Sequence, residues 1–102
     1  MIHLDKKITY HEENARSNTL KLREVLATMP SFSKDYFRAI EPNTSAKTRI
    51  SYVYDIRVFF TFLTASNPAF RDKGITEIRL EDLEKLQAVD IEEYLEYLKL
   101  YT

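Results

Sequence analysis

The sequence contains no cysteine, and among its 102 residues Gly74 is the only glycine. Without cysteine there is no disulfide framework, no cysteine-ligated zinc site and no cysteine nucleophile. A single glycine argues against a glycine-rich phosphate-binding loop and against a turn-rich β-sandwich. No apolar run approaches the ~18 residues that a membrane-spanning helix needs, and the first residues lack the apolar segment of a secretory signal. We therefore expect a cytoplasmic, all-α domain with no membrane partner.

A strong excess of one charge is also lacking, because 15 basic and 16 acidic side chains give a formal net charge of −1. A DNA-binding domain is usually strongly basic. The signs are unevenly distributed, however: residues 1–79 carry 13 basic and 9 acidic side chains, a net charge of +4, and residues 80–102 carry 2 and 7, a net charge of −5. Because potentials act over about 8 Å at physiological salt, the first segment can attract an anionic partner despite the total.

The length fits a single domain. Residues 1–16 show no sustained hydrophobic period, and we interpret them as a weakly ordered lead-in to a helical domain over residues 17–102. A first helix is predicted from Asn18 to Pro30, and a second, short helix follows with Ser31 or Ser33 as its N-cap. Their apolar faces consist of Leu22, Val25, Leu26 and Met29 in the first helix, and of Phe32, Tyr36, Phe37 and Ile40 in the second.

The strongest helical pattern in the chain begins after Asn43 and ends at about Ser66, before Asn67 and Pro68. A helix of about 20 residues is about 30 Å long. Its apolar stripe consists of Tyr52, Ile56, Phe59, Phe60 and Leu63, widened by Val53 and Phe62. A stripe of this width predicts that the helix lies at the centre of a bundle of about four to five helices.

Residues 69–79 are predicted to form a loop in which Gly74 can adopt a positive φ and in which Ile75 and Ile78 contact the core. A short helix follows, with its apolar side made of Leu80, Leu83 and Leu86.

A last helix is predicted from a capping box formed by Asp90 and Glu93. Its apolar stripe consists of Ile91, Tyr94, Leu95, Leu98 and Tyr101, and Glu92, Glu93 and Glu96 are expected to face solvent. The stripe still continues at the end of the sequence. A natural terminus can have this pattern, but we expect a domain that is truncated at its C-terminal end.

No residue pattern indicates catalysis or metal binding. The only histidines, His3 and His11, lie in the lead-in without a second ligand at helical spacing. Adjacent acids such as Glu92 and Glu93 point about 100° apart on a helix, as expected of a solvated surface and not of a paired-carboxylate catalyst. The tyrosines on apolar stripes are assigned to the core: Tyr36, Tyr52, Tyr94 and Tyr101. We predict no catalytic residue, no metal and no cofactor.

The start of the third helix carries the clearest functional pattern, because hydroxyl groups and cations occupy its first turns. The free N–H groups and the positive dipole end of a helix favour an anion there, and Lys47 and Arg49 add charge. Short hydroxyl side chains can donate to phosphates or to base edges. The candidate DNA-binding residues are Thr44, Ser45, Lys47, Thr48, Arg49 and Ser51. The same residues would also suit a well-capped helix start on an ordinary surface.

Residues 48–63, TRISYVYDIRVFFTFL, resemble the pattern T-x-x-x-Y-x-x-D-L-x-x-F-x-x-F-L of the N-terminal core-binding domain of tyrosine recombinases, the phage-integrase and Xer-type enzymes. Residues 78–83, IRLEDL, and 90–98, DIEEYLEYL, resemble the next helices of that domain in the same order. The resemblance covers residues 44–100 and implies a SAM-like bundle of helices.

This resemblance implies one half of a clamp around the recombination site, with double-stranded DNA as the partner. By position, Ser45, Lys47, Thr48 and Ser51 would meet DNA and Arg49 would contact a phosphate. The same resemblance places Asp55 in a structural role and implies these core residues: Tyr52, Ile56, Phe59, Phe60 and Leu63.

Recombinases of this family carry their catalytic Arg, His-x-x-Arg and nucleophilic Tyr in a separate C-terminal domain, and this sequence has no His-x-x-Arg. The resemblance therefore implies that the chain is not an enzyme by itself. Its other partners would be the C-terminal catalytic domain of the same protein and further recombinase protomers on DNA. The alternative is a helical protein-interaction module without DNA binding, indicated by the acidic C-terminal segment and by the stripe of Tyr94, Leu98 and Tyr101.

Overall fold

A computed structural model describes residues 10–101, and this part of the chain is helical with no strand. The predicted all-α fold of about four to five helices is therefore confirmed. The α-helices are α2 (Tyr10–Leu26), α3 (Phe32–Ile40), α4 (Ala46–Ser66), α5 (Leu80–Leu83) and α6 (Ala88–Tyr101), and two short 3-10 helices are η1 (Glu41–Asn43) and η2 (Ile75–Glu77). Residues 1–9 of the expected lead-in lie outside the described residues.

Helix α2 begins at Tyr10, earlier than the start predicted at Asn18. Residues 10–16, predicted to belong to a weakly ordered lead-in, are thus helical. Glu12 and Glu13 lie in the first turn and Arg23 lies in the last, so the charges at both ends complement the helix dipole. This exposed part of α2 has no apolar stripe, so hydrophobic periodicity does not predict it.

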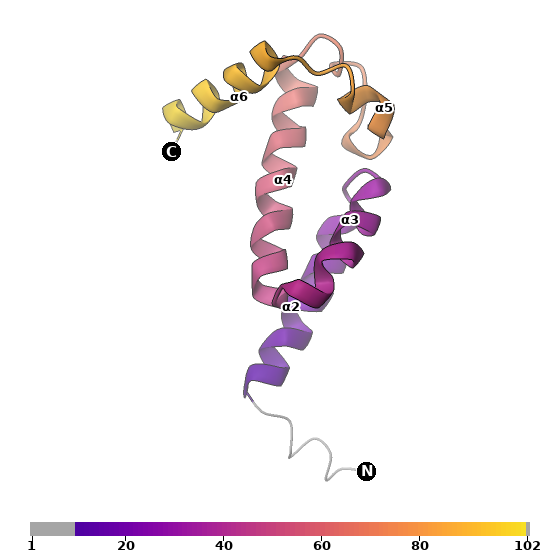
Figure 1. Ribbon diagram of the computed structural model, residues 1–102, viewed down its shortest axis with the longest axis vertical. Coiled ribbons are helices and arrows are strands. Elements are labelled where there is room, and N and C mark those ends of the chain that lie inside the picture. Colours follow the sequence, from indigo (N-terminus) through magenta and orange to yellow (C-terminus); the bar gives the residue numbers. More distant parts are fainter. Residues whose placement is uncertain (1–9, 102) are drawn as a thin grey trace.

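The core is built around α4, the long central helix in Figure 1, with α2 packed along it. Helix α3 contacts the same side through an edge-to-face pair between Phe32 and Phe60, whose ring centroids are 6.0 Å apart. The buried apolar residues are Leu22, Leu26, Met29, Phe37, Val53, Phe60, Leu63, Phe70 and Ile78. Burial of each such side chain contributes about 1.5–3 kcal/mol, so this cluster supplies the main stabilisation of the fold.

The buried face of α4 runs through Arg49, Val53, Phe60 and Leu63. Tyr52 was predicted on this face, but it is 43% exposed, and the prediction is wrong. The neighbouring Val53 is fully buried in its place, because a shift of one residue turns a helical side chain by about 100°.

Two further tyrosines assigned to the core, Tyr36 and Tyr101, are also exposed, so those assignments are wrong as well. Tyr94 is half-buried. The cap of α3 also differs from the expectation: Ser31 occupies the N-cap position without a side-chain cap hydrogen bond, and Ser33 is buried.

The loop between α4 and α5 contacts the core as predicted, because Ile78 is buried and Ile75 packs against the core cluster. Gly74 has a φ of −75°, so the turn does not use the positive φ that glycine allows. Its N–H donates to the Glu77 Oε1 atom at 2.8 Å, which holds the turn closed.

Helix α6 begins one turn before the predicted capping box. The carboxylate of Asp90 accepts from the Gln87 N–H at 2.8 Å and from the Asn67 side-chain amide at 3.1 Å. Asp90 therefore lies inside the first turn instead of preceding it, and it joins the start of α6 to the end of α4. In Figure 1, α6 starts beside the C-terminal end of α4 and extends to the side away from α3 and α5.

Aromatic side chains hold α6 against α4. The ring of Phe59 lies 4.8 Å from that of Tyr94, and the ring of Phe62 lies 4.9 Å from that of Tyr97, between centroids. Burial raises the pKa of Tyr94 above its ordinary value of 10.0, and the carboxylate of Asp55 adds to this effect. Asp55 itself is exposed, and the structural role expected for it stays a prediction.

Asp82 ties α5 to the preceding loop. Its Oδ2 atom accepts from the Arg79 N–H at 2.9 Å and lies 3.4 Å from the Lys73 ammonium nitrogen. The hydrogen bond from Arg79 and the charge of Lys73 outweigh the effect of burial and hold the pKa of Asp82 below its ordinary value of 3.8.

We predict that an Asp82→Asn variant is less stable than the wild type at neutral pH and that this difference shrinks in acid. A lowered pKa in the folded state means that the carboxylate stabilises the fold above 3.8 and loses this effect as pH falls through the folded-state pKa. Urea unfolding of both proteins at a series of pH values measures the difference. A difference that stays constant down to the acid transition would contradict the assignment.

Candidate nucleic-acid interface

The site begins in the turn between α3 and α4, where short polar residues satisfy the helix ends. The Thr44 hydroxyl donates to the Ile40 carbonyl at 2.7 Å, so it stabilises the C-terminal end of α3. Ser45 is the N-cap of α4, and its Oγ atom accepts from the Thr48 N–H at 3.1 Å. The Ser45 hydroxyl also donates to the Thr48 Oγ1 atom at 2.9 Å. The turn therefore sets the direction in which α4 leaves it.

Arg49 lies beneath this turn, not on its surface. Its side chain is buried, with only 8% of the residue exposed. The Nη1 group donates to the carbonyls of Glu41 and Thr44 and to the Thr44 hydroxyl. Arg49 shares the buried face of α4 with Val53, which is why it cannot lie on the exposed helix start where the sequence pattern placed it.

Lys47 and Ser51 lie on the opposite side of α4, one turn apart, and both are exposed. At about 100° per residue, they point roughly 160° to 200° away from Arg49 around the helix. Within residues 10–101, neither side chain makes an ion pair or a hydrogen bond, so both are free to contact a ligand.

The six candidate residues thus divide into three groups. Lys47 and Ser51 share an exposed surface, which we call the α4 face. Thr44, Ser45 and Thr48 form the cap network beside it, and Arg49 supports the turn from within. The α4 face can therefore contact an anion that lies near the N-terminal end of this long, capped helix.

A second basic surface was missed by the sequence analysis. Side chains from α2 and α3 line a groove of about 440 Å³ whose floor includes Arg49. We call it the α2–α3 groove, and its basic residues are Arg23, Lys34, Arg38 and Arg49. The spacing of Lys34 and Arg38, four residues apart on one helix, was a usable signal, but only the packing of the helices brings Arg23 to the same place.

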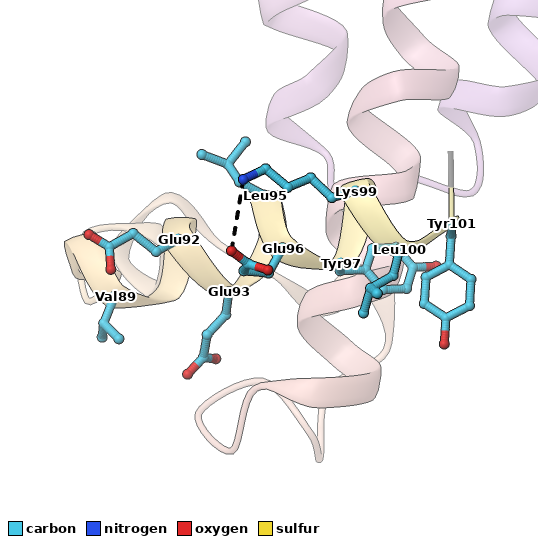
Figure 2. Close-up of a pocket in the computed structure, with 9 residues that line it drawn as sticks. All are labelled: Val89, Glu92, Glu93, Leu95, Glu96, Tyr97, Lys99, Leu100 and Tyr101. Carbon is cyan, nitrogen blue, oxygen red and sulfur yellow. Dashed lines mark ion pairs between the residues drawn. The ribbon is translucent and has the colours of Figure 1, made fainter.

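A third surface runs along α6 (Figure 2). A shallow hollow of about 730 Å³ is lined by side chains of α6 alone among the described residues. The three glutamates predicted to face solvent do so, and Glu96 pairs with Lys99 at 3.9 Å. Of the predicted apolar stripe, Tyr94 and Leu98 are half-buried, while Ile91, Leu95 and Tyr101 are exposed.

Within residues 10–101, no group of three or more histidine, cysteine or acidic side chains is placed to hold a metal ion. No helix in that range is long and apolar enough to cross a membrane. His3 and the side chain of His11 lie outside the described part of the chain.

Comparisons with known proteins give no relative for this chain. No family model matches it, no curated protein matches it, and no solved structure matches it. The candidate interface therefore depends on the geometry described above.

We predict that Arg49→Met lowers the free energy of unfolding by about 1–3 kcal/mol, because the part-buried carbonyls of Glu41 and Thr44 lose their hydrogen bonds from a charged donor. Lys47→Met is the matched control, since it removes the same charge from an exposed position and should change stability by no more than about 0.5 kcal/mol. Urea unfolding followed by circular dichroism measures both. Equal stabilities of the two variants would show that Arg49 does not support the turn.

Proposed function

We propose that this chain is the DNA-binding, core-binding domain of a site-specific tyrosine recombinase. In this proposal it clamps the recombination site while a separate C-terminal domain of the same protein cuts and rejoins DNA. The observation that carries it is the α4 face: Lys47 and Ser51 are exposed and unpaired in the described part of the chain, one turn apart at the start of a 21-residue helix.

The chemistry of this surface suits duplex DNA. The long side chain of Lys47 can reach a phosphate. The positive end of the α4 dipole also favours the negative charge of that phosphate. The Ser51 hydroxyl, one turn further along, can donate to or accept from a base edge if α4 enters the major groove. The cap made by Ser45 and Thr48 keeps the helix start rigid, so both groups are presented from a fixed element.

The order of the helices also supports the proposal. The segment that resembles the recombinase pattern over residues 48–63 lies entirely within α4, and the later segments fall on α5 and α6. Because the sequence has no His-x-x-Arg, we propose a binding function and no catalysis by this chain alone. Its partners would be double-stranded DNA, the catalytic domain and other recombinase protomers on DNA.

We predict that the chain binds duplex DNA weakly, with a dissociation constant of about 10⁻⁴ to 10⁻⁶ M at physiological salt, and that Lys47→Glu weakens this binding at least about tenfold. The reversed charge repels a phosphate and does not disturb the fold, since Lys47 is exposed. Fluorescence anisotropy with a labelled duplex at several salt concentrations measures the effect.

Arg71→Glu is the matched control, because Arg71 is an exposed cation in the loop at the other end of α4. It changes the net charge by the same amount and should affect binding much less. Equal losses for both variants would mean that binding reflects total charge and not the α4 face. If amide signals of residues 47–51 do not move when duplex is added at low salt, the α4 face is not the interface.

A second candidate function is a protein-interaction module that works through α6. The observation that favours it is the exposure of Leu95, which is 51% exposed, next to Ile91 on a helix that leaves the core. Exposed apolar side chains on one helix are typical of a surface that contacts another protein, here a second copy of the chain.

For this candidate we predict a concentration-dependent increase in mass that Leu95→Glu abolishes, because a carboxylate at an apolar contact opposes association. Leu20→Glu is the matched control, since Leu20 is an equally exposed leucine on α2. Sedimentation equilibrium measures the masses. A chain that stays monomeric at every concentration would rule out self-association through α6.

A further inference from the structure

Arg49 is a buried cation without an acidic partner. None of the ion pairs among the described residues includes it, and all three of its side-chain hydrogen bonds go to neutral oxygens from the single Nη1 group. A buried charge is normally paired, because removing it from water is costly. The carbonyls of Glu41 and Thr44 orient this guanidinium but do not neutralise it. The structure therefore contains a fixed positive charge that no acidic side chain pairs with among residues 10–101.

Arg49 also lines the α2–α3 groove, whose volume is about 440 Å³. Three more cations line the same groove: Arg23 from α2, and Lys34 and Arg38 from α3. All three are exposed, and none forms an ion pair within residues 10–101. Four cations thus converge on one concave surface.

One acid, Glu41, also lines the groove. Its backbone carbonyl accepts from Arg49, but its carboxylate is exposed and makes no ion pair among the described residues. The groove therefore keeps an excess of three positive charges. Such a concentration of like charges makes the local potential more positive and attracts an anion to the groove.

We propose that the α2–α3 groove binds a phosphate group, with Arg49 as the fixed donor at its floor and with Arg23, Lys34 and Arg38 around its rim. An arginine offers planar, paired N–H groups that match phosphate oxygens, and Arg49 is already immobilised by its carbonyl contacts. In the DNA complex the phosphate belongs to the duplex backbone. This last assignment rests on the proposed function, whereas the phosphate site itself does not.

The first arm of the test uses inorganic pyrophosphate at constant ionic strength and the full chain. We expect the arginine Nε–H signals of Arg49, Arg23 and Arg38 to shift and saturate, while that of Arg71 stays still. Arg38→Ala weakens this binding about tenfold, because it removes one charge-assisted contact without touching the turn. Arg71→Ala, the matched control, leaves it unchanged.

The second arm uses a short DNA duplex. If a backbone phosphate occupies the groove, the Arg49 signal shifts with the duplex, and Arg38→Ala lowers the slope of log K against log salt by about one. If pyrophosphate moves the Arg49 signal and duplex does not, the groove takes a free phosphate ligand and the assignment to DNA is overturned.

The outcomes separate this proposal from the proposed function. If neither pyrophosphate nor duplex moves the Arg49 signal, the groove is not a phosphate site. A duplex that perturbs Lys47 and Ser51 but not Arg49 rejects the groove as a DNA contact and leaves the α4 face standing. A duplex that perturbs none of these residues rejects DNA binding, and the pyrophosphate result still decides for or against the groove.

Discussion

The guanidinium of Arg49 joins the turn after α3 to the helix that follows it. Its Nη1 group donates to the carbonyls of Glu41 and Thr44, so η1 and the start of α4 cannot separate without breaking these part-buried hydrogen bonds. The α4 face and the α2–α3 groove both depend on this junction. It determines where Ser45 caps α4, and therefore how Lys47 and Ser51 are presented, and it places a positive charge at the floor of the α2–α3 groove.

The two basic surfaces consequently lie on different sides of the same helix start. Lys47 and Ser51 face solvent, away from the bundle, and Arg49 faces α2 and α3. The net charge of −1 does not describe either surface, because residues 80–102, which include α5 and α6, carry a net charge of −5 and the residues before them carry +4. An anionic ligand near either basic surface would be affected mainly by the charges close to it, since at physiological salt potentials reach about 8 Å and α4 is about 30 Å long.

Helical periodicity predicted α4 well, because a strong cap, a long apolar stripe and a terminating Asn67-Pro68 all agree there. Periodicity failed where tertiary contacts determine which residues are buried. Tyr52 and Val53 both belong to plausible stripes, and packing in the core cluster selects Val53. Arg49 is a surface residue by type, and only the carbonyls of the preceding turn explain its burial. The α2–α3 groove combines side chains from two helices, so no pattern within one helix could reveal it.

The most direct test of this account is the side-chain NMR spectrum of Arg49 at neutral pH. Three acceptors hold the Nη1 group of Arg49, so its guanidinium rotates slowly about the Nε–Cζ bond. The account therefore predicts separate Nη1 and Nη2 signals for Arg49 and averaged signals for the exposed Arg38. Averaged signals for both would contradict it, because a freely rotating Arg49 could neither hold the turn nor act as a fixed phosphate donor.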